Sequence, residues 1–252
     1  MEGMRGFWQA IGFLTALPVP ARHRQTAPLA LAIPWFPAVG ALVGVVCGLA
    51  YLLGDRLAGP LGPLAAVTAW LVITRALHVD GFADTVEGFL GGATPERRLE
   101  IMKDSRIGVF GTVAIVWLIS SKWATLSMLV MGRDPKTAIR VIGALALIYG
   151  AGRWVHLVLA LCSRSARAGL GSAVVEQVHG RAVIVAAIPL VLLILALQLW
   201  KMSAVFPVAV GVALLSAWLA HRMIGGLTGD VFGFASELFE VVMLAYAGAF
   251  GV

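Results

Sequence analysis

Charged residues are scarce in this sequence. Only 13% of the 252 residues are Asp, Glu, Lys or Arg, whereas 60% are hydrophobic, and the mean hydropathy is +0.92. An ordinary soluble domain carries about 25% charged residues, so the composition excludes that class of protein. Because no interval of soluble-domain size separates the apolar runs, the sequence predicts a single integral membrane domain over residues 1–252.

Cysteine is rare, and the signatures of several common sites are missing. Cys47 and Cys162 both lie inside apolar runs, so neither a disulfide framework nor a zinc site is indicated. The histidines show no metal-ligand spacing. The sequence also has no nucleophile elbow, Walker loop or dinucleotide fingerprint. These absences leave the acidic and basic residues as the candidates for chemistry.

Long apolar runs dominate what is present. A helix needs about 20 apolar residues to cross the roughly 30 Å hydrocarbon core of a bilayer. The sequence predicts an all-α, polytopic transmembrane helix bundle of about seven spans, with amphipathic helices at the cytoplasmic face. The predicted spans are residues 33–54, 61–79, 107–131, 139–161, 183–200, 204–224 and 238–252. The apolar N-terminal stretch has Pro18 and Pro20 where a signal-peptide cleavage site would lie, so we expect it to be retained at the interface or packed on the bundle.

The basic residues are distributed unevenly over the predicted loops. Seven spans place the N-terminal segment and the loops at 80–106, 162–182 and 225–237 on one side of the membrane. That side carries eleven Lys or Arg residues and the other side five. The positive-inside preference makes the richer side cytoplasmic. The same preference accounts for the net charge of +6, so nucleic acid is not expected as a partner.

Acidic residues gather in two stretches, 78–108 and 225–240, which we interpret as the site loops. In the first stretch, Asp80, Asp84 and Glu87 stand at i, i+4 and i+7, which stacks them on one stripe of a helix. Like charges so arranged repel unless a cation lies between them, and Mg²⁺ prefers carboxylate, water and phosphate oxygens. The spacing therefore indicates a metal–phosphate site. A solvated helical face whose acids pair with nearby arginines remains the alternative.

The rest of the first stretch reads as an amphipathic helix on the membrane surface that ends in Lys103-Asp104-Ser105-Arg106. Arginine grips phosphate with two donors at once. Arg106 and Asp104 could therefore hold a phosphate and its metal together. The alternative is a basic anchor that flanks the next span.

The second stretch combines glycines at 225, 226, 229 and 233 with three acids. Glycine-rich backbone beside Asp230, Glu237 and Glu240 is a candidate phosphate cradle, and a turn between helices is the alternative. Arg153 lies in the middle of an apolar run. An intramembrane ionisable residue is a functional candidate, although pairing with an acid for packing would explain it equally well.

Three ordered motifs carry a family resemblance. They are HVDGFADT at 78–85, RLEIMKDSRIG at 98–108 and GGLTGD at 225–230, and the segments FLTALPVP and FPAVGALVG near the N-terminus add to them. Together they resemble cobalamin synthase, the adenosylcobinamide-GDP ribazoletransferase family, over nearly the whole chain.

The resemblance implies a polytopic transferase of the bacterial inner membrane, with its active site facing the cytoplasm. Such an enzyme transfers the adenosylcobinamide phosphate group from adenosylcobinamide-GDP to α-ribazole or its 5′-phosphate. The reaction releases GMP, forms adenosylcobalamin or its 5′-phosphate as a late step of cobalamin biosynthesis, and requires Mg²⁺. The expected partners are these two substrates, the lipid bilayer and, if the chain oligomerises, a second copy.

The motifs and the chemistry together give a set of predicted site residues. The predicted catalytic residues, all charged, are Asp80, Asp84, Asp104, Arg106, Asp230 and Glu237. The predicted metal ligands, all carboxylates of the first stretch, are Asp80, Asp84, Glu87 and Asp104. The predicted substrate-binding residues, all polar or basic, are Arg98, Lys103, Ser105, Arg153 and Thr228.

Two other functions fit parts of the pattern. A CDP-alcohol phosphotransferase also cuts a pyrophosphate at a membrane face, but its Asp-Gly-x-x-Ala-Arg pattern fails here because Asp84 follows Ala83 directly. A cation-coupled secondary transporter would place its acids near the bilayer midplane within broken helices. Most of the acids here fall in a charged segment outside the predicted spans, which disfavours that function.

Overall fold

The computed structural model describes residues 2–21 and 29–251. Within those residues the chain is helical, with no strand and a single isolated bridge between Ser165 and Leu227. The α-helices are α1 Glu2–Leu14, α2 Leu29–Ala32, α3 Phe36–Leu57, α4 Leu61–Thr74, α5 Leu77–Gly91, α6 Pro95–Ile101, α7 Val109–Ser127, α8 Pro135–Leu161, α9 Leu170–Gln177, α10 Gly180–Leu197, α11 Val205–Ile224 and α12 Gly229–Phe250. Short 3₁₀ helices cover Ile33–Trp35 and Trp200–Ala204. The predicted all-α bundle is confirmed.

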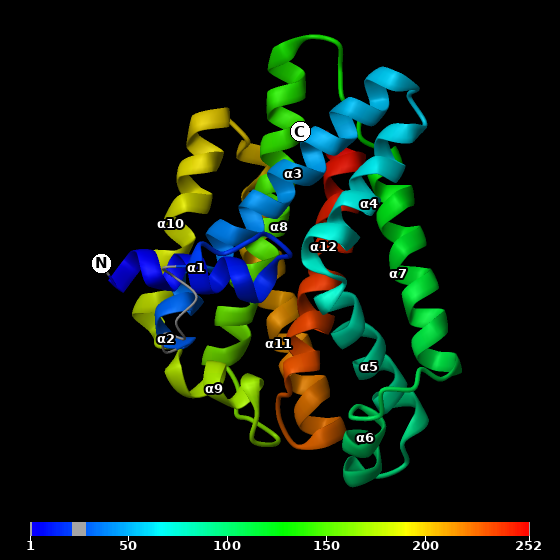
Figure 1. Ribbon diagram of the computed structural model, residues 1–252, viewed down its shortest axis with the longest axis vertical. Helices are drawn as coiled ribbons and strands as arrows, with labels where there is room; N and C mark the ends of the chain where they lie inside the picture. The colour runs from blue at the N-terminus through cyan, green and yellow to red at the C-terminus, as the bar shows by residue number, and fades with distance from the viewer. Residues whose placement is uncertain (1, 22–28, 252) are drawn as a thin grey trace.

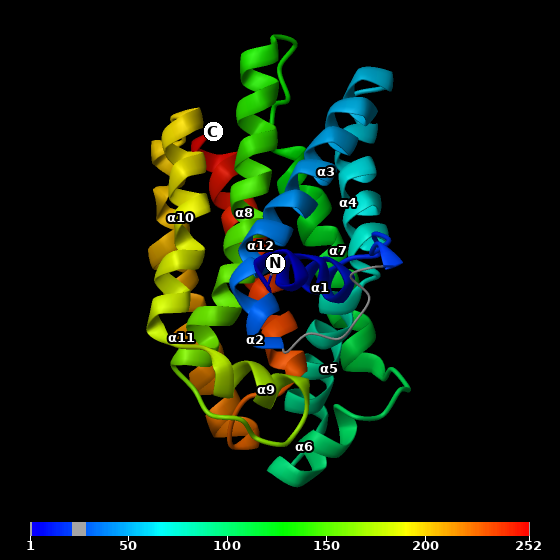
Figure 2. The ribbon, with the colours of Figure 1, turned by 60° about the vertical axis from the view of Figure 1, so that its left-hand side comes forward.

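The long helices run up and down around α8 (Figures 1 and 2). Every residue of α8 from Gly143 to Ala160 is buried, as expected for a helix that is apolar on all sides. Helices α3, α10, α11 and α12 pack directly on α8, while α4, α5 and α7 form the side next to α3 and α12.

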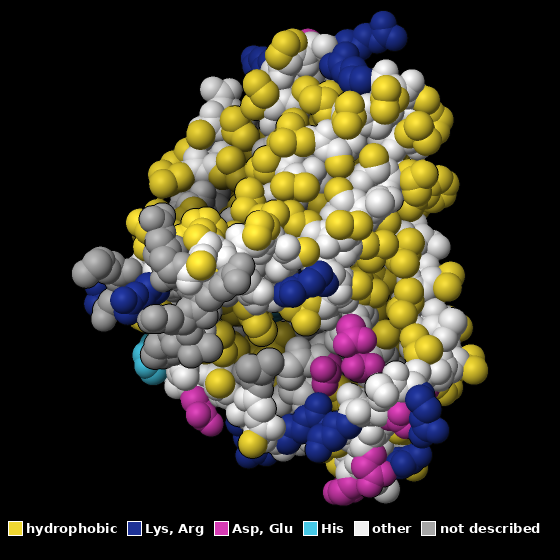
Figure 3. Space-filling view, viewed as in Figure 1, with side chains coloured by type: hydrophobic (Ala, Val, Ile, Leu, Met, Phe, Trp, Pro, Cys, Tyr) yellow, Lys and Arg dark blue, Asp and Glu magenta, His cyan; other side chains and the backbone are white. Residues whose placement is uncertain are grey.

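Six helical segments are long and apolar enough to cross a membrane, and the bent pair α4–α5 brings the number to seven if it counts as one span. Hydrophobic side chains cover most of the middle of the molecule in Figure 3, and charged side chains gather toward its ends. The outward-facing side chains include Leu53, Val116, Ile184 and Leu214, all about half exposed or more. This surface suits contact with lipid tails, and the prediction of about seven spans is confirmed.

The predicted span 61–79 is wrong at its end. Helix α4 stops at Thr74, because Arg75 and Ala76 both take the left-handed conformation with φ of +53°, which breaks the hydrogen-bond ladder. Helix α5 then begins at an angle of 88° to α4. The residues from Leu77 to Gly91 therefore form a helix packed against α7 and α12 rather than a loop outside the bundle.

The last predicted span, 238–252, is also wrong at its start. Helix α12 begins at Gly229 and includes Asp230, Glu237 and Glu240. The charges in this helix are tolerated because Glu237 and Glu240 meet buried cations of α7 and α8. Most of the two stretches predicted as site loops, 78–108 and 225–240, is therefore helical.

Both acidic stretches lie at the same end of the bundle, as predicted. The segments 92–108, 162–179 and 225–228 all meet at the lower end in Figures 1 and 2, and the connections after α3, α7 and α10 lie at the upper end. The N-terminal helix α1 lies across the bundle, where the Arg75 guanidinium donates to the Gly12 carbonyl at 3.0 Å. This agrees with the expected packing on the bundle. Arg22 and Arg24, counted among the basic residues of this side, lie outside the described residues.

Glycine sets the close approach of α3 to α8. A Cβ placed on Gly44 would lie 2.3 Å from the Leu145 carbonyl oxygen, whereas one on Gly211 in α11 would meet nothing within 4 Å. We expect Gly44→Ala to lower the free energy of unfolding by about 1–3 kcal/mol through overpacking. Gly211→Ala, the matched control, should be neutral or stabilise by up to about 1 kcal/mol. Thermal unfolding in detergent checks both, and equal midpoints would contradict the close packing.

Candidate active site

Helices α5 and α12 cross in backbone contact at the lower end of the bundle. A Cβ on Gly81 would lie 2.9 Å from the Asp230 carbonyl oxygen, and a Cβ on Gly233 would lie 3.0 Å from the His78 carbonyl oxygen. Only residues without a side chain allow this approach. The crossing brings Asp80 and Asp84 beside Asp230, although these acids are about 150 residues apart in the chain.

The acids at the crossing repel one another. Asp84 is half-buried, and the charges of Asp80, Asp230 and Glu87 all act on its carboxylate, with Arg167 as the opposing charge. Over residues 2–21 and 29–251, the side chains of Asp80 and Asp84 have no hydrogen-bond or ion-pair partner. Clustered carboxylates are stabilised by an added cation. The structure thus brings together three of the predicted site acids, Asp80, Asp84 and Asp230.

Asp230 lies in the first turn of α12. The Thr228 hydroxyl donates to Asp230 Oδ2 at 3.1 Å, and Arg167 Nη2 donates to the same oxygen at 3.3 Å. A carboxylate in the first turn is stabilised by the positive end of the helix. A Cβ placed on Gly229 would meet nothing within 4 Å. Thr228 is thus a neighbour of the acid cluster, and its role in substrate binding stays a prediction.

Sequence reasoning missed Arg167. Its loop is held beside the start of α12 by two backbone hydrogen bonds of 2.8 Å, in which Ala166 N–H donates to the Leu227 carbonyl and Leu227 N–H donates to the Arg164 carbonyl. The sequence offered no signal beyond a cation in a basic loop, since the pairing joins residues about 60 positions apart. Arg167 is the cation that the structure places nearest to these acids by ion pairing.

Glu87 lies on the same helix as Asp80 and Asp84, and its carboxylate is hydrogen-bonded to α7. Its carboxylate accepts the backbone N–H of Gly111 at the start of α7, where the helix has no side-chain cap of its own. A negative charge there stabilises the helix end. The role of Glu87 as a metal ligand stays a prediction. In the structure this carboxylate accepts a backbone hydrogen bond at the start of α7.

Asp104 and Arg106 form a two-pronged ion pair in the loop between α6 and α7, with a shortest distance of 2.7 Å. The hydrogen bonds from Arg106 lower the pKa of Asp104 to about 2, so Asp104 is ionised at neutral pH. Lys103 and Ser105 are exposed beside this pair. Arg98 donates to the Met223 carbonyl at 3.0 Å and so attaches α6 to α11. The structure does not bring Asp104 to the three aspartates, and the substrate contacts of these residues stay predictions.

Glu237 and Arg153 belong to a separate, deeper group, which we call the buried ion cluster: Lys122, Arg153, Glu237 and Glu240. Lys122 pairs with both glutamates, and Arg153 Nη1 lies 2.9 Å from Glu240 Oε1. All four side chains are at most 1% exposed. Arg153 is thus paired with an acid, and its role in substrate binding stays a prediction. The catalytic role of Glu237 stays a prediction, and the structure does not place it with the aspartates.

A cavity of about 180 Å³ opens beside the aspartates. We call it the histidine cavity, because His78 and His156 line it together with Asp80, Asp230, Phe36 and Phe232. Sequence reasoning set the histidines aside because their spacing suits no metal. Their contact joins α5 to α8 and could not be inferred from spacing.

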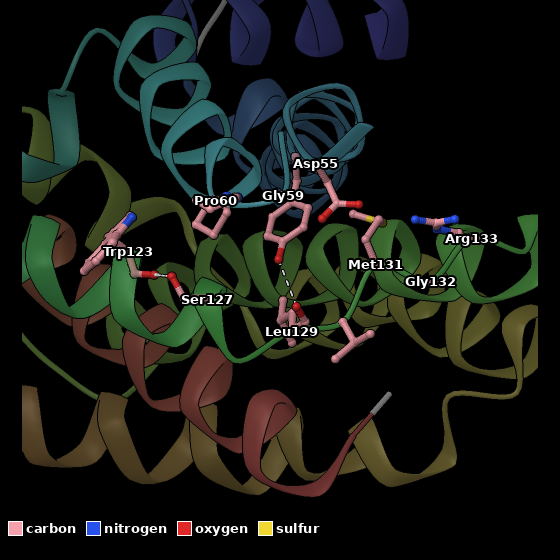
Figure 4. A pocket seen from close by; sticks show the side chains of 12 residues that line it. Asp55, Gly59, Pro60, Trp123, Ser127, Leu129, Met131, Gly132 and Arg133 are labelled. Atoms are coloured by element: carbon pink, nitrogen blue, oxygen red, sulfur yellow. Dashed lines mark hydrogen bonds between the residues drawn. The ribbon is translucent and has the colours of Figure 1, made fainter. Parts of the chain in front are cut away.

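A larger cavity, about 590 Å³, lies between the connections after α3 and α7, at the opposite end of the bundle (Figure 1). Figure 4 shows it from close by. It is bounded by the turn after α3 and by the Leu129–Arg133 connection, where the Tyr51 hydroxyl donates to the Leu129 carbonyl at 2.9 Å. Asp55 is the one acid among its lining residues. Without a cluster of acids, this cavity is a weaker candidate for phosphate chemistry than the α5–α12 crossing.

The residues of the crossing fit Mg²⁺. No group of three or more His, Cys, Asp or Glu side chains within the described ranges is placed to hold an ion by itself. Mg²⁺ does not need such a cage, because it commonly binds one or two carboxylates and takes its other ligands from water and substrate phosphates. Asp80 and Asp84 are unpaired and at least partly accessible, so they match this requirement.

Comparison with known families decides the classification. The sequence model of the family described as cobalamin-5-phosphate synthase matches residues 6–248 of this chain. The chain belongs to this family.

Curated relatives are similar to this chain over nearly the full length of both sequences. An adenosylcobinamide-GDP ribazoletransferase of Chlorobaculum tepidum is 36% identical over 246 residues, which cover 95% of this chain and 93% of the relative. Proteins with the same name from Ralstonia nicotianae and Citrobacter koseri are 35% and 34% identical, over 96% and 94% of this chain and 94% and 97% of the relatives. No solved structure matches this chain.

Membership of the cobalamin-5-phosphate synthase family agrees with the geometry. The three motifs that carried the resemblance lie on α5, on α6 with the loop after it, and at the start of α12, and all three are at the lower end of the bundle. The neighbouring family considered from the sequence, the CDP-alcohol phosphotransferases, is not favoured by these comparisons.

Proposed function

We propose that this protein transfers the adenosylcobinamide phosphate group from adenosylcobinamide-GDP to α-ribazole or its 5′-phosphate, with release of GMP. The observation that carries the proposal is the likeness to adenosylcobinamide-GDP ribazoletransferases over more than 90% of both chains. The crossing of α5 and α12 supports it, since unpaired carboxylates at a membrane face suit a diphosphate substrate. The product is adenosylcobalamin or its 5′-phosphate, formed late in cobalamin biosynthesis.

The reaction exchanges one phosphoester bond for another. A ribose hydroxyl that is free in both α-ribazole and its 5′-phosphate, and so not the 5′ oxygen, bonds to the phosphorus next to the corrinoid. The bond from that phosphorus to the bridging oxygen breaks, so GMP leaves with the bridging oxygen. In-line displacement of this kind depends on positioning and charge neutralisation rather than on a protein nucleophile. We assign Asp230 to accept the proton of the attacking hydroxyl, and Arg167 and Arg106 to bind phosphate oxygens.

Asp80 and Asp84 would hold Mg²⁺. When bound, the ion neutralises charge on the diphosphate and on the leaving phosphate. The two aspartates stand one helical turn apart on α5, so their carboxylates share one face. Their place on α5, which packs closely against α12, sets the position at which a diphosphate would bind.

The proposed location is the bacterial inner membrane, with the aspartates on the cytoplasmic side. The basic residues support this orientation, because the predicted loops at the end that carries the aspartates are richer in Lys and Arg than those at the other end.

Release of GMP tests the proposed function. Purified protein in detergent should release GMP from adenosylcobinamide-GDP only when α-ribazole or its phosphate and Mg²⁺ are both present, and EDTA should stop the release. Folded protein that releases no GMP under these conditions would contradict the assignment. Release of CMP from a CDP-linked lipid would instead support a CDP-alcohol phosphotransferase.

A further inference from the structure

The histidine cavity has walls from helices distant in the sequence. Phe13 comes from α1, Phe36 from α3, His78 from α5, His156 from α8, Val174 from α9 and Phe232 from α12. Aromatic and imidazole rings therefore form much of its surface. At its edge lie Asp80 and Asp230, two of the acids assigned to the reaction.

Two imidazoles in this wall have unused polar atoms. The rings of His78 and His156 stack with centroids 5.3 Å apart and an interplanar angle of 27°, and the residues are only 5% and 4% exposed. Nδ1 of His78 and Nε2 of His156 are buried without a hydrogen-bond partner among the described residues. A buried polar atom without a partner costs about 1–3 kcal/mol. A ligand that supplies a hydrogen bond would recover part of this cost.

The size of the cavity narrows the choice of ligand. A volume of about 180 Å³ is below the roughly 300–1,000 Å³ of pockets that enclose drug-sized molecules. A corrinoid or a complete nucleotide is therefore too large, whereas one planar base fits. Phe36 and Phe232 meet His156 edge-on, with interplanar angles of 85° and 76°, an arrangement typical of aromatic packing.

The two substrates carry different bases, guanine and benzimidazole, and these bases differ in polarity. Guanine carries an amide and an exocyclic amine, which would each need a partner in a wall built mainly of apolar rings, and burying such groups without partners is costly. A benzimidazole has only two ring nitrogens, one of which is bonded to the ribose in the nucleoside. The second nitrogen needs a single donor, which a neutral histidine supplies.

We propose that the histidine cavity binds the base of the acceptor nucleoside, a planar and largely apolar bicyclic heteroaromatic such as the benzimidazole of α-ribazole. The ribose then lies toward Asp80 and Asp230, with its attacking hydroxyl on the side of the reacting phosphorus. This inference rests on the proposed function for the identity of the nucleoside. The location of the base-binding site rests on the cavity and its unpaired imidazole nitrogens.

Binding of 5,6-dimethylbenzimidazole to the purified full-length chain tests the inference without turnover. Isothermal titration calorimetry in detergent should show saturable binding to the wild type. His156→Phe keeps a ring but removes Nε2, and it should weaken binding about tenfold or more. Val174→Trp fills the cavity and should abolish binding. The matched control is Val175→Trp on the same short helix, because Val175 does not line the cavity.

Kinetics give a second readout. In His156→Phe, KM for α-ribazole should rise about tenfold or more, while KM for adenosylcobinamide-GDP should stay within about twofold. If Val174→Trp elutes aggregated in size-exclusion chromatography, Leu77→Trp replaces it, since Leu77 lines the cavity and is 39% exposed.

The two proposals fail in different ways. Equal base binding in the wild type and the folded filling variant would overturn the cavity assignment, and so would competition by guanosine. GMP release with no base binding, and with unchanged KM in His156→Phe, would also count against the cavity alone. Base binding with no GMP release would count against the proposed function alone.

Discussion

Asp80→Asn is expected to lower kcat for GMP release about 100-fold or more. The substitution keeps the size of the side chain and removes the charge that would hold Mg²⁺ at the diphosphate. Loss of one group that stabilises charge in a transition state costs about 10²- to 10³-fold in rate. Asp80 is exposed and unpaired at the α5–α12 crossing, so the fold has little need of its charge. Steady-state release of GMP over a range of Mg²⁺ concentrations measures the effect.

Glu96→Gln is the matched control for this experiment. Glu96 is an exposed acid in the first turn of α6, at the same end of the bundle, and its removal should leave kcat within about twofold. Asp84→Asn should resemble Asp80→Asn. Undiminished release in both aspartate variants, with unchanged Mg²⁺ dependence, would remove the basis for assigning the metal to α5.

Lys122→Met is expected to cause the largest loss of stability. Lys122 pairs with Glu237 and Glu240, and its Nζ also lies 3.7 Å from the centroid of the Trp70 ring. The substitution leaves two buried carboxylates with Arg153 as their one cation in the cluster. Breaking a buried pair in this way costs about 3–5 kcal/mol. For a chain of this size the midpoint of thermal unfolding should fall by about 6–20 °C.

A double variant separates charge imbalance from lost packing. Lys122→Met with Glu237→Gln returns the buried ion cluster to one cation and one anion, so it should recover a large part of the lost stability. Lys136→Met, which removes an exposed lysine of α8, should change the free energy of unfolding by less than about 0.5 kcal/mol. A double variant as unstable as the single one would show that packing around Lys122, rather than its charge, dominates.

Local patterns in the sequence were enough to predict much of the fold. The apolar runs of α7, α8, α10 and α11 predicted spans close to the observed helices, because hydrophobicity over 20 residues depends on the chain alone. The spacing of Asp80, Asp84 and Glu87 predicted one helical stripe, and all three lie on α5. The clustering of acids at one membrane face followed from the number of spans between them.

Features that depend on contacts between distant segments could not be predicted. The bend at Arg75 and Ala76 carries no glycine or proline signal, although glycine is the usual residue in the left-handed conformation. Arg167 reaches Asp230 through hydrogen bonds between two loops. The pairing of Lys122 with Glu240 spans 118 residues, and the stacking of His78 on His156 joins two helices. Periodicity within one segment holds no information about such contacts.

The buried ion cluster also fixes how far α12 is turned about its own axis. Asp230 and Glu240 lie on this one helix, ten residues and so roughly 15 Å apart. A slip of one residue would turn the helix by about 100° and swing Asp230 away from α5. Ion pairs in the interior of the bundle thereby set the direction in which a carboxylate at its end points.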